Sequence, residues 1–128
     1  MRQEYVMGNG AIALGALTAG VNVVSGYPGT PSSEIIETIA KHSNKDVHVE
    51  WSVNEKAALE VAASGAYAGA RTLVTMKQVG LNVAADPLMS LAYVGVKGGM
   101  VIVSADDPGP ISSQTEQDTR AFAEFARI

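Results

Sequence analysis

The stretch Val21–Pro31, VNVVSGYPGTP, places an apolar, β-branched run directly before Pro, Gly and Thr. Such a run, bounded by turn-forming residues, is typical of a strand that ends in a loop. Thr30 before Pro31 favours the start of a helix, because Thr can cap the first turn and Pro is tolerated at the first helical position. The stretch therefore predicts a strand, a loop at its carboxyl end, and a helix that begins at Pro31.

The same order of strand, loop and helix recurs along the rest of the chain. Alternating apolar and polar residues predict a strand at residues 46–51, and apolar runs predict two more at residues 72–76 and 100–104. Helical patterns cover residues 9–19, 52–70, 81–93 with a bend at Pro87, and 118–127. The run at 100–104 is continuously apolar, as in a strand that is covered on both faces. Strands that alternate with helices predict an α/β fold with a doubly wound, mainly parallel sheet and helices on both faces.

The composition narrows the possible functions. The 128 residues suffice for about one domain. A net charge of −4 and an aromatic content of 5% argue against a nucleic-acid-binding surface. The absence of Cys excludes disulfides, a Cys nucleophile and an iron–sulfur cluster held by this chain, and it fits a cytoplasmic location. The apolar stretch at residues 11–24 is interrupted by Gly and is too short to span a membrane.

Four segments follow the predicted strands and should meet at one edge of the sheet, where open parallel sheets bind ligands. They are residues 26–33, 52–55, 77–80 and 104–109. The first combines Gly, Pro and hydroxyl groups at a helix start, which suits an anion such as a carboxylate or phosphate but also suits a capped turn. Asp106 and Asp107 could bind a cation or form a turn with the Pro-Gly pair that follows, and we predict no metal site.

Glu55 has two interpretations from the sequence. Ser52 lies three residues before it, which is the spacing of a capping box in which the Glu side chain bonds the backbone of the cap residue. The same helix face continues as Ala58, Leu59 and Ala62, so the carboxyl group would also stand at the end of an apolar stripe. There it would be partly desolvated and suited to holding or sharing a proton.

The helix that follows Glu55 is rich in small residues, with the sequence AALEVAASGAYAGA at residues 57–70. Small side chains allow another element to approach closely, either inside the domain or from a second domain or subunit. Lys56 and Glu60 have the spacing of an ion pair on the polar side of the same helix.

Five segments resemble the N-terminal part of the alpha subunit of indolepyruvate ferredoxin oxidoreductases. This family is a branch of the thiamine-diphosphate-dependent 2-oxoacid:ferredoxin oxidoreductases. The resemblance runs in order over nearly all 128 residues. The segments that carry it are MGNGAIA (7–13), GYPGTPSSEI (26–35), EWSVNEKAA (50–58), MKQVGLN (76–82) and SSQTEQDTR (112–120).

The resemblance implies that residues 1–128 are a pyrimidine-binding domain, truncated at its C-terminal end, which pairs with a diphosphate-binding domain. A Glu in the position of Glu55 bonds the pyrimidine N1′ atom in this family and activates thiamine diphosphate. Thr30 corresponds to a position near the 2-oxoacid group of the substrate. Pro28, Gly29 and Gln78 fall on the cofactor rim, so we expect them to contact the cofactor.

The resemblance further implies that the whole enzyme decarboxylates indolepyruvate or another aryl pyruvate oxidatively, transfers the acyl group to coenzyme A and reduces ferredoxin. The chain lacks the motif that holds Mg²⁺ and the diphosphate, so we expect both on an absent domain, and iron–sulfur clusters on other absent segments. We expect a dimer or higher hetero-oligomer, an inactive isolated chain, and no membrane or nucleic-acid partner. Ile111 stands where the family pattern has His.

Two other functions stay open from the sequence. The chain could belong to another branch of the 2-oxoacid:ferredoxin oxidoreductases with a different acyl substrate. It could also be a non-catalytic docking module that uses its small-residue helix to bind a partner.

Overall fold

The sheet of the computed structural model, which describes residues 5–128, has four parallel strands in the order β2-β1-β3-β4. The strands are β1 (Val23–Gly26), β2 (His48–Trp51), β3 (Thr72–Lys77) and β4 (Met100–Ala105). Gly26 lies opposite both Trp51 and Thr75, and Lys77 lies opposite Ala105. The carboxyl ends of all four strands therefore share one edge of the sheet, and the predicted parallel α/β fold is confirmed.

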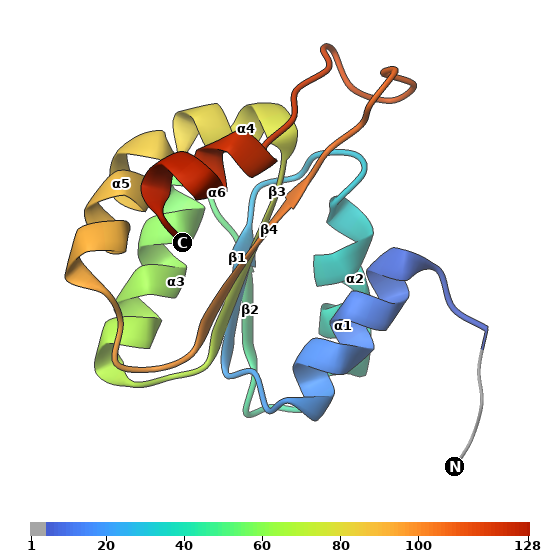
Figure 1. The fold of residues 1–128 in the computed structure, drawn as a ribbon. Helices are drawn as coiled ribbons and strands as arrows, with labels where there is room; N and C mark the ends of the chain where they lie inside the picture. The colour runs from blue at the N-terminus through green and yellow to red at the C-terminus, as the bar shows by residue number, and fades with distance from the viewer. Residues whose placement is uncertain (1–4) are drawn as a thin grey trace.

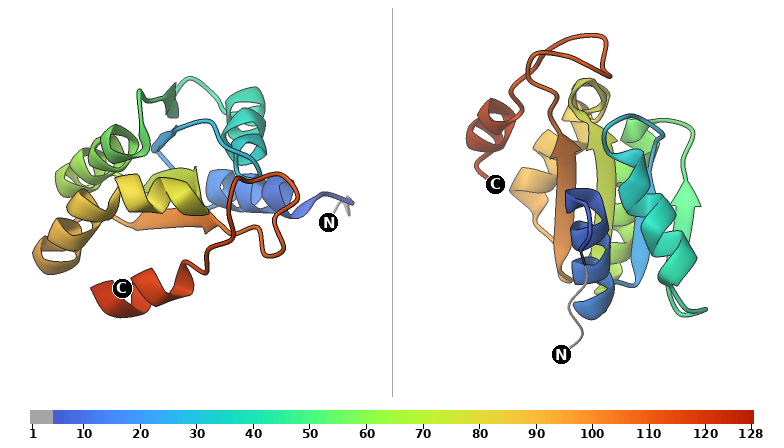
Figure 2. Two further views of the ribbon diagram at one scale, coloured as in Figure 1. Left: turned by 90° about the horizontal axis from the view of Figure 1, so that it is seen from above. Right: turned by 90° about the vertical axis from the view of Figure 1, so that its right-hand side faces the viewer.

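Helices cover both faces of this sheet (Figures 1 and 2). They are α1 (Gly8–Thr18), α2 (Ser33–His42), α3 (Glu55–Ala68), α4 (Gln78–Val83), α5 (Ala85–Val94) and α6 (Arg120–Ala126). Helices α1 and α2 pack on one face, whereas α3, α4 and α5 pack on the other. The helix predicted at residues 81–93 is divided at Ala84, not bent at Pro87. Pro87 falls in the first turn of α5, where a missing N–H is tolerated.

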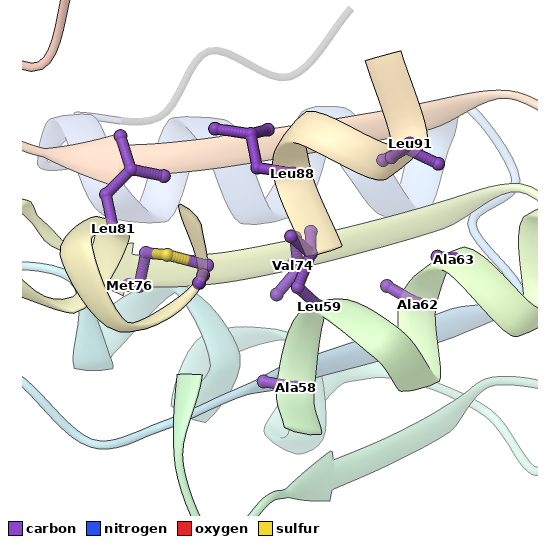
Figure 3. Close-up of a cluster of buried hydrophobic side chains, with 10 residues drawn as sticks. Ala58, Leu59, Ala62, Ala63, Val74, Met76, Leu81, Leu88 and Leu91 are labelled. Carbon is purple, nitrogen blue, oxygen red and sulfur yellow. The ribbon is translucent and has the colours of Figure 1, made fainter. Parts of the chain in front are cut away.

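The core under α3 explains the small residues of that helix (Figure 3). Ala58, Leu59 and Ala62 are fully buried against Val74 and Met76 of β3. A Cβ added at Gly65 would lie 3.1 Å from Thr72, so the helix approaches the sheet closely there. The buried small residues of α3 therefore serve packing inside the domain.

Strand β4 differs from its prediction. Its apolar run was expected to be covered on both faces, but Val101 is 55% exposed and β4 forms the edge of the sheet. Apolar hollows flank it on both sides, one lined by Leu91 and Val96 and the other by Ala16 and Val21. The apolar run therefore predicts a strand correctly, but it does not predict that this strand lies at the edge of the sheet.

No helix within residues 5–128 combines the length and the apolar character that a membrane crossing requires.

Candidate functional site

The start of α3 places Glu55 at the carboxyl edge of the sheet. Asn54 is the N-cap residue, and its side-chain oxygen accepts the Ala57 backbone N–H at 2.8 Å. The hydroxyl of Ser52 instead donates to Glu50 at 3.1 Å. The interpretation of Ser52 and Glu55 as a capping box is therefore wrong, because Asn54 caps the helix and the described residues show no bond from Glu55 back to Ser52.

Glu55 is nearly buried, with 7% of its surface exposed. Behind it, Ala58 and Leu59 are fully buried, so the expected apolar stripe exists and the carboxyl group is partly desolvated. The hydrogen bonds at the start of α3 involve Asn54 and Lys56 and leave the Glu55 carboxylate without a partner within residues 5–128. A carboxylate at the first helical position is favoured by the helix dipole. Glu55 thus presents a nearly buried carboxylate at a helix start, with oxygens that can accept a hydrogen bond.

Helix α4 forms the wall beside this carboxylate. It follows β3 without an intervening loop. Its first turn lies against the start of α3. A Cβ added at Gly80 would lie 2.5 Å from Oε1 of Glu55 and 2.7 Å from its Cγ. The Glu55 side chain therefore occupies the space that a side chain at position 80 would need.

The loop between β1 and α2 contributes the next part of the edge. Pro28 and Thr30 are exposed, whereas Gly29 is half-buried against the side chain of Lys77. The predicted helix start at Pro31 is wrong, because the Gly29 carbonyl accepts the N–H groups of residues 32 and 33 in a tight turn and α2 begins only at Ser33. These two N–H groups are thus already bonded, whereas Thr30 and Tyr27 are both exposed in this loop and each carries a hydroxyl group.

Gln78 lies at the first position of α4 and is fully buried. Its Nε2 atom donates to the Thr115 carbonyl at 2.8 Å, and its Oε1 atom accepts the Ser113 hydroxyl at 3.4 Å. The same hydroxyl lies 3.2 Å from the carbonyl of Thr30. Gln78 therefore connects the β1–α2 loop and α4 through the loop that follows β4.

Residues 112–117 form a strap over the carboxyl edge, in the loop drawn in orange and red at the top of Figure 1. Besides the Gln78 contacts, Lys77 donates to Gln114 at 2.7 Å, and Asn82 and Gln117 exchange two hydrogen bonds of 2.9 and 3.0 Å. In the sequence, only the family resemblance indicated that this segment is important. Its polar side chains have no spacing that would have predicted these partners.

Asp107 shapes the same loop from within. One of its oxygens accepts the backbone N–H groups of Ile111, Ser112 and Ser113, with the Ser112 bond the largest cause of its lowered pKa. Asp106 accepts both the N–H and the hydroxyl of Thr119. Both carboxylates thus accept hydrogen bonds from the segment that follows them. No cluster of three metal-ligating side chains occurs in the described part of the chain.

Two further predictions concern exposed residues. Lys56 pairs with Asp86 at 2.6 Å, and this contact raises the pKa of Lys56. The predicted pair with Glu60 is therefore wrong, since a carboxylate on α5 is closer. The side chain of Ile111 is 93% exposed on the loop after β4.

The chain is similar in sequence to the proteins of one family. The sequence model of the family described as "Pyruvate flavodoxin/ferredoxin oxidoreductase, thiamine diP-bdg" matches residues 14–115. The chain is 51% identical to the indolepyruvate oxidoreductase subunit IorA of Archaeoglobus fulgidus, over 97% of this chain and 21% of that protein. It is 52% identical to the subunit of the same name from Pyrococcus horikoshii, over 96% of this chain and 19% of that protein.

Among solved structures, the fold is similar to a 2-oxoglutarate:ferredoxin oxidoreductase from Magnetococcus marinus, determined with 2-oxoglutarate, coenzyme A and succinyl-CoA bound. The TM-score is 0.78 at 24% identity, over 92% of this chain and 21% of that chain. The chain therefore spans about a fifth of the length of the curated relatives and of this structure.

Proposed function

We propose, since this chain belongs to the pyruvate flavodoxin/ferredoxin oxidoreductase thiamine-diphosphate-binding family, that it is the cofactor-activating part of an indolepyruvate oxidoreductase. The observation that carries the proposal is the nearly buried Glu55 carboxylate at the carboxyl edge of the sheet, which has no partner within residues 5–128. The identity of about 50% to subunits of indolepyruvate oxidoreductases supports the choice of substrate.

The residues at the edge fit an aminopyrimidine. A carboxylate that is held by a helix start, is partly desolvated and lacks an internal partner can accept a hydrogen bond from a protonated ring nitrogen. Bound thiamine diphosphate would supply the carbon nucleophile and the electron sink for loss of CO₂ from a 2-oxoacid. Glu55 would share a proton with the pyrimidine N1′ atom and so favour the tautomer that acts as the internal base.

Other residues of the edge would bind and orient. The exposed hydroxyl of Thr30 would donate to the 2-oxoacid group of the substrate. Pro28 and Gly29 would form the cofactor rim beside it. Gln78 would contribute chiefly by holding residues 112–117 over the edge, because its amide already bonds Ser113 and Thr115.

The remaining parts of the reaction would be supplied by other segments. We propose that residues 1–128 are the pyrimidine-binding domain, and that a diphosphate-binding domain holds the diphosphate and Mg²⁺. Iron–sulfur clusters on further segments would pass electrons to ferredoxin, and coenzyme A would accept the acyl group. The assembly would be a cytoplasmic dimer or higher hetero-oligomer, in which this chain alone is inactive.

A domain exchange tests the proposal. The matching 124-residue segment of the Pyrococcus horikoshii subunit would be replaced by this chain, and the chimera would be assembled with the rest of that enzyme. We expect thiamine-diphosphate-dependent oxidation of indolepyruvate, with kcat/KM within about ten-fold of the parent enzyme and the same ranking of indolepyruvate over phenylpyruvate and pyruvate.

Two results would contradict the proposal. A chimera that assembles but leaves thiamine diphosphate unbound, as measured by isothermal titration, would favour a docking module. A chimera whose preference shifts by ten-fold or more towards pyruvate, relative to the parent, would favour another 2-oxoacid branch.

A further inference from the structure

Gly80 lies directly against the side chain of Glu55. It lies in the six-residue helix α4, is buried, and faces the first residue of α3. The three atoms nearest to a Cβ built at Gly80 all belong to Glu55: Oε1 at 2.5 Å, Cγ at 2.7 Å and Cδ at 2.9 Å. The missing side chain at position 80 therefore makes room for one group, the Glu55 carboxyl.

Backbone conformation does not explain this Gly. Positive φ values occur at Gly20, Gly69, Gly95 and Gly109, and Gly80 is not among them. A helical position of this kind accepts Ala, and Ala is normally the more stable choice in a helix. The reason for Gly at position 80 therefore lies in the space above it and not in its own φ and ψ angles.

A Cβ at position 80 would act on Glu55 in one particular way. The colliding atoms Cγ, Cδ and Oε1 all turn with rotation about the Cα–Cβ bond of Glu55, so this side chain can rotate aside, but its carboxylate then leaves its present place. Active groups usually have to be held to within about 0.5 Å of their productive position. A displacement of the carboxylate would thus impair its chemistry while the fold survives.

We propose that Gly80 is a positioning residue for Glu55: because it has no Cβ, the carboxylate can stay at the place where it would meet the cofactor. This inference rests on the proposed role of Glu55 as the proton-sharing group. Gly80 itself would touch neither substrate nor cofactor through a side chain, and its effect would pass entirely through Glu55.

The contact is tested first on the 128-residue chain, by urea unfolding of a double-mutant cycle. Gly80→Ala is compared in the presence of Glu55 and in a Glu55→Ala background, where Cγ, Cδ and both oxygens are gone. With Glu55 present, we expect the folding equilibrium constant to fall about five-fold or more. In the Glu55→Ala background, we expect it to rise about two- to five-fold, as for an ordinary helical Gly→Ala change.

Gly15→Ala is the matched control, since Gly15 also lies in a helix and a Cβ there would meet nothing within 4 Å. It should raise the folding equilibrium constant in both backgrounds. If Gly80→Ala has the same effect with and without the Glu55 side chain, to within about two-fold, the contact does not control the carboxylate and the proposal is overturned.

The positioning role is tested in the chimera by the rate at which the C2 proton of bound thiamine diphosphate exchanges with deuterium. We expect Gly80→Ala to slow this exchange by ten-fold or more with little change in cofactor affinity, and Gly15→Ala to leave it unchanged. Normal exchange in Gly80→Ala, when Glu55→Gln is slow, would refute the positioning role alone. Normal exchange in Glu55→Gln would instead refute the proposed function, whatever the unfolding cycle shows.

Discussion

Leu59 lies one turn after Glu55 and anchors the helix that carries the carboxylate. It is fully buried and packs against Val74 in the core cluster shown in Figure 3. Leu59→Ala removes three carbon atoms from this site. At about 0.8 kcal/mol for each buried methylene-sized group, the lost transfer free energy is about 2.4 kcal/mol. The cavity that remains adds to this loss, so we expect a total destabilisation of about 3–4 kcal/mol.

Urea unfolding monitored by circular dichroism measures this change directly. With a slope of about 2 kcal/mol per M urea, a loss of 3–4 kcal/mol corresponds to a midpoint shift of about 1.5–2 M. Val83→Ala is the control, because Val83 is 48% exposed and its truncation should shift the midpoint by less than about 0.5 M. The slope itself should stay constant in both variants.

A midpoint shift for Leu59→Ala that is no larger than that for Val83→Ala would refute the described core. It would mean that α3 does not pack on β3 as described, and that the burial of Glu55 at its start has no structural basis.

Two further predictions concern other parts of the chain. Gly26→Ala should lower the stability by about 1–3 kcal/mol, because a Cβ there would collide with Ile36 and lie 2.8 Å from the Thr75 carbonyl oxygen; an unchanged melting temperature would contradict this close approach. Hydrogen bonds from Arg120 lower the pKa of Asp118 from 3.8 to about 2, so this pair stabilises the fold above pH 4 and loses its effect as the pH falls through about 2. Arg120→Gln should return the pKa of Asp118, measured by NMR titration, towards 3.8. A pKa that stays near 2 in this variant would show that the Arg120 side chain does not lower it.

The strands and their parallel arrangement could be predicted from local sequence. Runs such as Thr72–Lys77 are apolar and β-branched, and they alternate with helical segments, which is sufficient to indicate a parallel α/β sheet. The edge position of β4 could not be predicted, because a continuous apolar run reads the same in the middle of a sheet and at its border.

The helix starts were less predictable, since several capping residues compete at each one. Ser52 and Asn54 are both good N-cap residues, and in the structure Asn54 caps α3 while Ser52 bonds Glu50 on β2. Similarly, the turn around Gly29 moved the start of α2 from Pro31 to Ser33.

The burial of Glu55 could be predicted from the sequence, but the contacts around it could not. An apolar stripe behind a Glu at a strand end predicts a partly desolvated carboxyl, and the structure confirms this burial. The contact between Glu55 and Gly80 and the bonds from Gln78 to the loop after β4 join residues 25 to 37 positions apart. No local sequence pattern predicts contacts between residues so far apart in the chain.

In the function that we propose, the Glu55 carboxylate shares a proton with the pyrimidine ring of thiamine diphosphate. The most direct test of this role is the exchange of the C2 proton of the bound cofactor in D₂O, measured in the chimera with Glu55 and with Glu55→Gln. Loss of the general acid–base group should slow the exchange by at least about 100-fold while the cofactor remains bound. Exchange in the Glu55→Gln variant within about three-fold of the parent chimera, with the cofactor fully bound, would contradict this role of Glu55.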